Sequence, residues 1–151
     1  RIPFLIYTPG KIKGGTVVNE ALSCVDFMPT VMNLMDTKHG QKVDGRDATA
    51  LFTGSKADWN DMAFIRSTSA GKPWLCAVSD RYKLVYSDMG DPWLFDLEKD
   101  PDEMTNLFSD PVSKKVVTTM TDQLRSYSKL QKDPYADLPE IKSAMDKVLA
   151  K

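Results

Sequence analysis

Cysteine and histidine, whose side chains often serve as nucleophiles and metal ligands, are scarce in this chain. The sequence holds two cysteines, Cys24 and Cys76, and a single histidine, His39. A structural zinc site is usually built from four closely spaced cysteine or histidine ligands. One histidine and no Cys-x-x-Cys pair do not supply them, so we exclude zinc. The two cysteines fit either one disulfide or two separate thiols, and we favour two buried thiols.

Four aspartates could supply oxygen ligands for a calcium ion. They are Asp26, Asp36, Asp44 and Asp47. A calcium ion needs about six to eight oxygens that converge on one point, and this spacing does not promise such convergence. We therefore interpret each aspartate as a helix-capping or turn residue and predict no metal ligand.

The composition is that of an ordinary globular protein. Hydrophobic residues make up 42% of the 151 residues and charged residues 27%, which disfavours disorder and a fibrous architecture. Twenty basic and 21 acidic residues leave a net charge of -1 with no basic tract, so we expect no nucleic-acid partner. The apolar runs are far shorter than the roughly 20 residues of a membrane-spanning helix, so we expect no membrane segment.

The first 60 residues carry the pattern of one buried strand and one helix. The continuous apolar run Ile2–Tyr7 precedes a Thr-Pro-Gly turn and predicts a strand buried on both faces. Asp26 is expected to cap a helix that tolerates Pro29 in its first turn. If the predicted strand lacked its neighbours, its apolar edge would invite pairing with another chain. Self-association is therefore an expectation for this chain.

The remaining residues predict a small antiparallel sheet followed by helices. Strand-like runs occur at residues 63–67, 74–79, 81–87 and 93–97, separated by turn residues, which is typical of a meander. The last turn, residues 88–92, is expected to be wide. Strand alternation places Trp93, Phe95 and Leu97 on one face, which we expect to meet a helix.

Two amphipathic helices are predicted at the C-terminal end. One begins near Ser113, and its apolar residues recur at steps of three and four. The other begins at Asp137, with Glu140 three residues on as in a capping box. Their apolar stripes are formed by Val117, Met120, Leu124 and Tyr127 in the first and by Ile141, Met145 and Val148 in the second.

Five phrases in this sequence occur in the order of a known family. They are RIPFLI at 1–6 with PGKI at 9–12, SCVDFMPT at 23–30, DGRD at 44–47, RYKLVY at 81–86 and LFDLEKDPDEMTNL at 94–107. Together they resemble the C-terminal half of the sulfatase family, a branch of the alkaline-phosphatase-like superfamily. Each phrase is weak by itself, but their shared order makes chance similarity improbable.

The resemblance implies an α/β fold, of which this chain would form an α+β piece. Residues 1–60 would be the C-terminal end of the α/β catalytic domain, with its last strand and helix. Residues 61–151 would be a small C-terminal subdomain, an antiparallel sheet with packed helices. Because the chain begins at Arg1 and not at methionine, we expect it to be a piece of a longer protein, whose N-terminal half would be its partner.

The resemblance also implies a catalytic apparatus that this sequence lacks. Sulfatases use a formylglycine nucleophile, made from the first residue of a Cys/Ser-x-Pro-x-Arg motif, and a calcium ion. Neither cysteine has a proline two positions on, and Ser109 has Pro111 but no arginine at position 113. We therefore expect no catalytic residue and no cofactor in this chain, which alone should be inactive. The intact parent would hydrolyse sulfate esters with formylglycine and calcium.

Three residues are candidates for contact with a sulfated small molecule or glycan. His39 lies in a predicted loop that could face the cleft of the intact enzyme. Arg66 and Trp74 flank the loop at residues 67–73, where an arginine could grip sulfate and a tryptophan could stack on a ring. The alternative is that His39 is an ordinary loop residue and that the other two are strand residues with no ligand.

Two other functions stay open. A related phosphonate or phosphate ester hydrolase of the same superfamily would share this architecture. A stand-alone module that binds sulfated glycans is a third hypothesis, although a near-neutral chain lacks the basic face that polyanion binding normally needs. A periplasmic or secreted location is an expectation that comes from the family alone.

Overall fold

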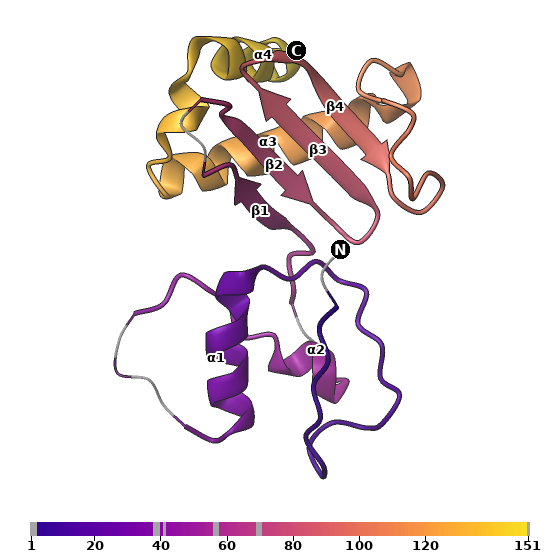
Figure 1. Cartoon of the computed structure of the whole chain (residues 1–151), viewed down its shortest axis with the longest axis vertical. Helices are drawn as coiled ribbons and strands as arrows, with labels where there is room; N and C mark the ends of the chain where they lie inside the picture. Colours follow the sequence, from indigo (N-terminus) through magenta and orange to yellow (C-terminus); the bar gives the residue numbers. More distant parts are fainter. Residues whose placement is uncertain (1–2, 38–39, 41, 56–57, 69–70, 151) are drawn as a thin grey trace. The chain divides into compact units, whose positions relative to one another are not determined.

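The chain folds into two compact units, residues 1–61 and residues 62–151. The structure is a computed structural model, and it describes residues 3–37, 40, 42–55, 58–68 and 71–150. Helices and a four-stranded antiparallel sheet give the chain the mixed α/β character predicted from the sequence (Figure 1). Within the described residues, no helix has the length and the apolar character needed to cross a membrane.

The first unit contains two helices, α1 (Cys24–Leu34) and α2 (Thr49–Thr53), joined by loops. Residues 3–7 form no strand, and Leu5 is 94% exposed, so the prediction of a buried strand is wrong for this chain. A strand is stabilised by hydrogen bonds to a neighbouring strand, and the described part of this unit contains no other strand to provide them.

The N-cap of helix α1 lies three residues before the predicted cap, Asp26. Ser23 has the extended backbone of an N-cap, and Asp26 is the third residue of the helix. The Ser23 backbone N–H donates to Oδ2 of Asp26 at 3.0 Å, which is the reciprocal half of a capping box. Pro29 consequently lies inside the helix, beyond the first turn where prolines are best tolerated.

The second unit is built on the sheet. Its strands are β1 (Ala63–Arg66), β2 (Trp74–Val78), β3 (Tyr82–Ser87) and β4 (Gly90–Asp96). They pair in sequence order and all antiparallel, so the predicted meander is confirmed. The turn between β3 and β4 is tighter than predicted, because Ser87 pairs with Gly90. Pro92 lies within β4, an edge strand, where a missing N–H is tolerated.

Helices follow the sheet and cover one of its faces (Figure 1). They are η1 (Pro111–Ser113), α3 (Lys114–Leu130), η2 (Pro134–Asp137) and α4 (Pro139–Leu149). Helix α3 begins where the sequence predicted. The N-cap of helix α4 lies one residue later than predicted, because Asp137 belongs to η2 and Leu138 is the extended N-cap. Pro139 then occupies the first helical position, where its fixed φ suits the helix.

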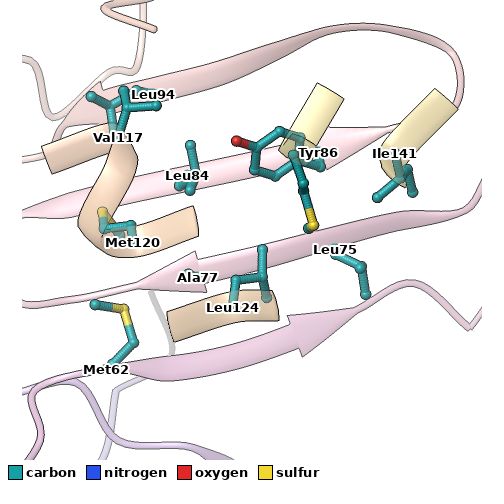
Figure 2. Packing of buried hydrophobic residues seen from close by; sticks show 11 residues of the cluster. Met62, Leu75, Ala77, Leu84, Tyr86, Leu94, Val117, Met120, Leu124 and Ile141 are labelled. Carbon is teal, nitrogen blue, oxygen red and sulfur yellow. The ribbon is translucent and has the colours of Figure 1, made fainter. Parts of the chain in front are cut away.

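The core lies between this sheet face and helices α3 and α4 (Figure 2). Leu94 of β4 is completely buried, whereas Trp93 is 49% exposed. The predicted face of β4 is therefore wrong by one residue. Register explains the difference: Leu94 pairs with Leu84, a core residue of β3, and paired residues share a face. Trp93 and Phe95 consequently lie on the opposite face.

Candidate functional site

A buried carboxylate joins two of the sequence phrases in the first unit. Asp26 is 3% exposed, and it accepts hydrogen bonds from the backbone N–H of Arg46 at 2.7 Å and from Nη2 of Arg46 at 3.3 Å. The same guanidinium donates to the carbonyl of Asn60 at 2.7 Å and lies 3.9 Å from the ring centre of Trp59. Asp26 therefore links the start of α1 to the DGRD loop, and its partner Arg46 links that loop to residues 59–60.

Gly45 of the DGRD loop lies directly against helix α1. A Cβ atom at this position would be 1.8 Å from the carbonyl oxygen of Val25. In a regular helix that carbonyl would accept from the N–H of residue 29, but Pro29 has none. The loop can approach the helix this closely only because Gly45 has no side chain.

Asp47 and Asp36 of the first unit also have hydrogen-bond partners. Asp47 accepts from the backbone and side chain of Thr49 at 2.9 and 2.5 Å and from Asn33. Partial burial acts to raise the pKa of Asp47, but these hydrogen bonds outweigh it and hold the pKa below its ordinary value. Asp36 pairs with Lys11 at 2.6 Å.

The carboxylates of Asp26 and Asp47 are already engaged by hydrogen-bond donors of the protein. Asp26 accepts from the backbone N–H groups of Ser23 and Arg46, and Asp47 accepts from Thr49. Among the described residues, no group of three or more His, Cys, Asp or Glu side chains is placed to hold a metal ion.

Both cysteines are free thiols. The prediction of two thiols is confirmed, but only Cys76 is buried, whereas Cys24 is exposed at the start of α1. Burial raises the pKa of Cys76 to about 12, so this thiol stays protonated near neutral pH and is a poor nucleophile.

Of the three predicted substrate-contact residues, the structure describes Arg66 and Trp74, and it places them on opposite faces of the sheet. His39 lies outside the described residues. Arg66 pairs with Leu75, a core residue, so its side chain belongs to the helix-covered face of the sheet. Trp74 is adjacent to Leu75 in β2, and strand alternation places it on the opposite face. The interpretation of Arg66 and Trp74 as two walls of one site therefore finds no support in this geometry.

Arg66 instead lines a cavity within the second unit. The cavity has a volume of about 280 Å³ and lies between β1 and the segment that joins α3 to η2. Arg66 Nη1 donates to Oδ1 of Asp133 at 3.3 Å, and its guanidinium is 5.1 Å from the ring centre of Tyr135. Ser128, Gln131 and Lys132 also line the cavity.

Sequence reasoning missed the residues that α3 and its end contribute to this cavity. The sequence pattern predicts only a loop at residues 132–136, between the two C-terminal helices. An Asp-Pro sequence shortly after the helix could have predicted the short helix η2. Asp133 is its N-cap and accepts from the backbone N–H of Tyr135 at 3.0 Å.

Solved structures share the fold of this chain. BT4656, solved with its substrate D-glucosamine-2-N,6-O-disulfate, is 21% identical, with a TM-score of 0.64 over 88% of this chain and 28% of that chain. The phosphonate monoester hydrolase SpPMH from Silicibacter pomeroyi is 24% identical, with a TM-score of 0.62 over 86% of this chain and 29% of that chain. These likenesses show that the chain has the fold of a part of each of these two enzymes.

Sequence comparison shows the family to which the chain belongs. The model of the family "N-sulphoglucosamine sulphohydrolase, C-terminal" matches residues 1–130. An arylsulfatase from Clostridium perfringens is 32% identical over 114 residues, which are 72% of this chain and 24% of the relative. The chain belongs to the sulfatase family, as its sequence phrases predicted, and spans about a quarter of the length of the curated relatives it matches.

Proposed function

We propose that this chain is the C-terminal portion of an enzyme that hydrolyses sulfate esters. The observation that carries the proposal is the family match over residues 1–130, supported by the 32% identity to an arylsulfatase. The chain would complete the fold of the parent enzyme and contribute to the surface that surrounds its substrate.

The nucleophile and the metal ion would come from the rest of the parent. As in the family, these would be a formylglycine and a calcium ion. Two observations support this assignment: no Cys/Ser-x-Pro-x-Arg sequence occurs in the 151 residues, and the described residues offer no metal cluster. The chain alone would be inactive.

The partner of this chain would be the N-terminal half of the parent. Large apolar side chains that are exposed in both units support this proposal, because such surfaces mark interaction sites. Leu5 and Tyr7 are almost fully exposed in the first unit, and Ile65 and Trp93 are about half exposed on the sheet face opposite the helices in the second. Without that partner, the same surfaces would favour self-association, which sedimentation at high concentration would detect.

A substrate panel tests the proposed reaction. The intact parent would be assayed on 4-nitrophenyl sulfate, on a sulfated monosaccharide, and on a phosphonate and a phosphate monoester of the same alcohol. We expect the sulfate esters to have the highest kcat/KM. The structural likeness to a phosphonate monoester hydrolase makes that activity the second candidate, and preference for the phosphonate ester would establish it in place of sulfatase activity.

A further inference from the structure

We propose that the cavity beside Arg66 binds a sulfated sugar unit of the substrate. The proposal rests on the sulfatase function proposed above and adds a binding site to it. All residues that carry the argument belong to the second unit, on β1, on α3 and on the segment that follows α3.

The size of the cavity suits a single sugar. Its volume is about 280 Å³, at the lower end of the range of roughly 300–1,000 Å³ that is usual for small-molecule sites. One wall includes Phe64 and Tyr127, whose rings are stacked with centroids 4.3 Å apart. An apolar wall of this kind can pack against the C–H face of a sugar ring.

The charge of the cavity matches a sulfate monoester. Arg66, Lys132 and Asp133 contribute two positive charges and one negative charge, a net charge of +1. A sulfate ester carries a single negative charge, whereas a phosphate monoester carries about -1.5 to -2 near pH 7. The carboxylate of Asp133 therefore favours the sulfate ester over the more highly charged phosphate ester, and it can also accept from a sugar hydroxyl.

The guanidinium of Arg66 is held in place by its neighbours but still has N–H donors available to a ligand. Asp133 and the ring of Tyr135 fix its guanidinium, yet half of the side chain is exposed. A guanidinium carries five N–H donors, and the bond to Asp133 uses one of them. The others can grip sulfate oxygens, which is the geometry for which arginine is suited.

Ser128 also lines the cavity, although the residue as a whole is only 2% exposed. A serine hydroxyl can both donate and accept a hydrogen bond, so in this proposal it bonds to an oxygen of the ligand.

The test is a binding titration of the 151-residue chain with glucose 6-sulfate, followed by NMR. We expect saturable chemical-shift changes of the Ser128 and Lys132 amides. Arg66→Met and Lys132→Met should each bind at least tenfold more weakly. The control Lys129→Met removes a lysine of α3 that does not line the cavity, and its binding should be unchanged. Ser128→Ala should weaken binding severalfold without changing the fold.

Three results would overturn the proposal. They are the absence of saturable binding, equal binding by Arg66→Met and the unsubstituted chain, and equal or tighter binding of glucose or glucose 6-phosphate. Hydrolysis of 4-nitrophenyl sulfate by the intact parent separates the two proposals. If the parent cleaves this ester but the cavity binds no sulfated sugar, only the cavity proposal fails; if the parent cleaves no sulfate ester, the proposed function fails as well.

Discussion

The carboxylate of Asp26 accepts hydrogen bonds from both the backbone N–H and the guanidinium of Arg46, at 2.7 and 3.3 Å. These residues come from two sequence phrases 20 positions apart, and a single buried charge joins them. Because Arg46 also stacks on Trp59, the loss of this charge should loosen the whole first unit.

Asp26→Asn is therefore expected to destabilise the first unit by about 2–3 kcal/mol, because a neutral amide weakens charge-assisted bonds and turns one acceptor into a donor. Urea unfolding followed by fluorescence would measure the loss, since Trp59 reports on this unit. The matched control is Asp36→Asn, which removes an exposed pair with Lys11 and should cost less than about 1 kcal/mol. Equal effects of the two substitutions would contradict a structural role for Asp26.

Gly45→Ala should be among the most damaging small substitutions in the chain. The added Cβ would meet the Val25 carbonyl oxygen at 1.8 Å, and backbone atoms on both sides must move apart to admit it. We expect a loss of about 3 kcal/mol or more, at the upper end of overpacking effects, measured by thermal unfolding. Gly14→Ala is the control, since a Cβ there meets nothing within 4 Å; a Gly45→Ala protein as stable as the control would refute the close approach.

Acid should weaken the second unit through Asp96. The hydrogen bonds from Arg81, the nearest at 2.8 Å, hold the pKa of Asp96 below its ordinary value. The ionised carboxylate is therefore more favourable in the folded state than in the unfolded state, where its pKa is about 3.9. Its stabilising effect is fully present above that pH and is lost as the pH falls through the lower pKa of the folded state. The stability difference between the unsubstituted chain and Asp96→Asn should therefore shrink between pH 6 and pH 2.

Glu98→Gln is the control for this pH profile, because Glu98 contacts the same arginine at 3.3 Å but is exposed. Its stability should follow that of the unsubstituted chain at every pH. A difference between Asp96→Asn and the unsubstituted chain that stays constant with pH would show that ionisation of Asp96 does not contribute.

The two thiols should differ in reactivity. Iodoacetamide at pH 8 should modify Cys24, which is exposed, and spare Cys76, whose burial raises its pKa to about 12. Mass spectrometry should show one adduct on the folded chain and two after denaturation, and Cys24→Ser should abolish the adduct on the folded chain. Two adducts on the folded chain, or none, would contradict this arrangement.

Sequence reasoning predicted the elements of the second unit well because their signals are local. The meander follows from short β-rich runs between turn residues, and α3 follows from apolar residues at steps of three and four. The buried face of β4 was predicted wrongly because both faces of this strand carry apolar side chains, Trp93 and Phe95 on one and Leu94 on the other. Only the pairing of Leu94 with the core residue Leu84 decides which face is buried.

The first unit and the cavity depended on contacts that no local pattern contains. Residues 3–7 have the composition of a buried strand, but strand formation depends on a neighbouring strand. Ser23 competes with Asp26 as the cap of α1, and the hydrogen bond between them decides the start of the helix. Arg66 was identified as a ligand candidate, but its neighbour Asp133 lies 67 residues away in the sequence.

The most direct test of the account is the release of inorganic sulfate from 4-nitrophenyl sulfate, measured with equal molar amounts of the intact parent and of the 151-residue chain. We predict turnover by the parent and none above background by the chain, because the nucleophile and the metal ligands would lie outside these residues. Sulfate release by the purified chain, or none by the parent, would contradict it.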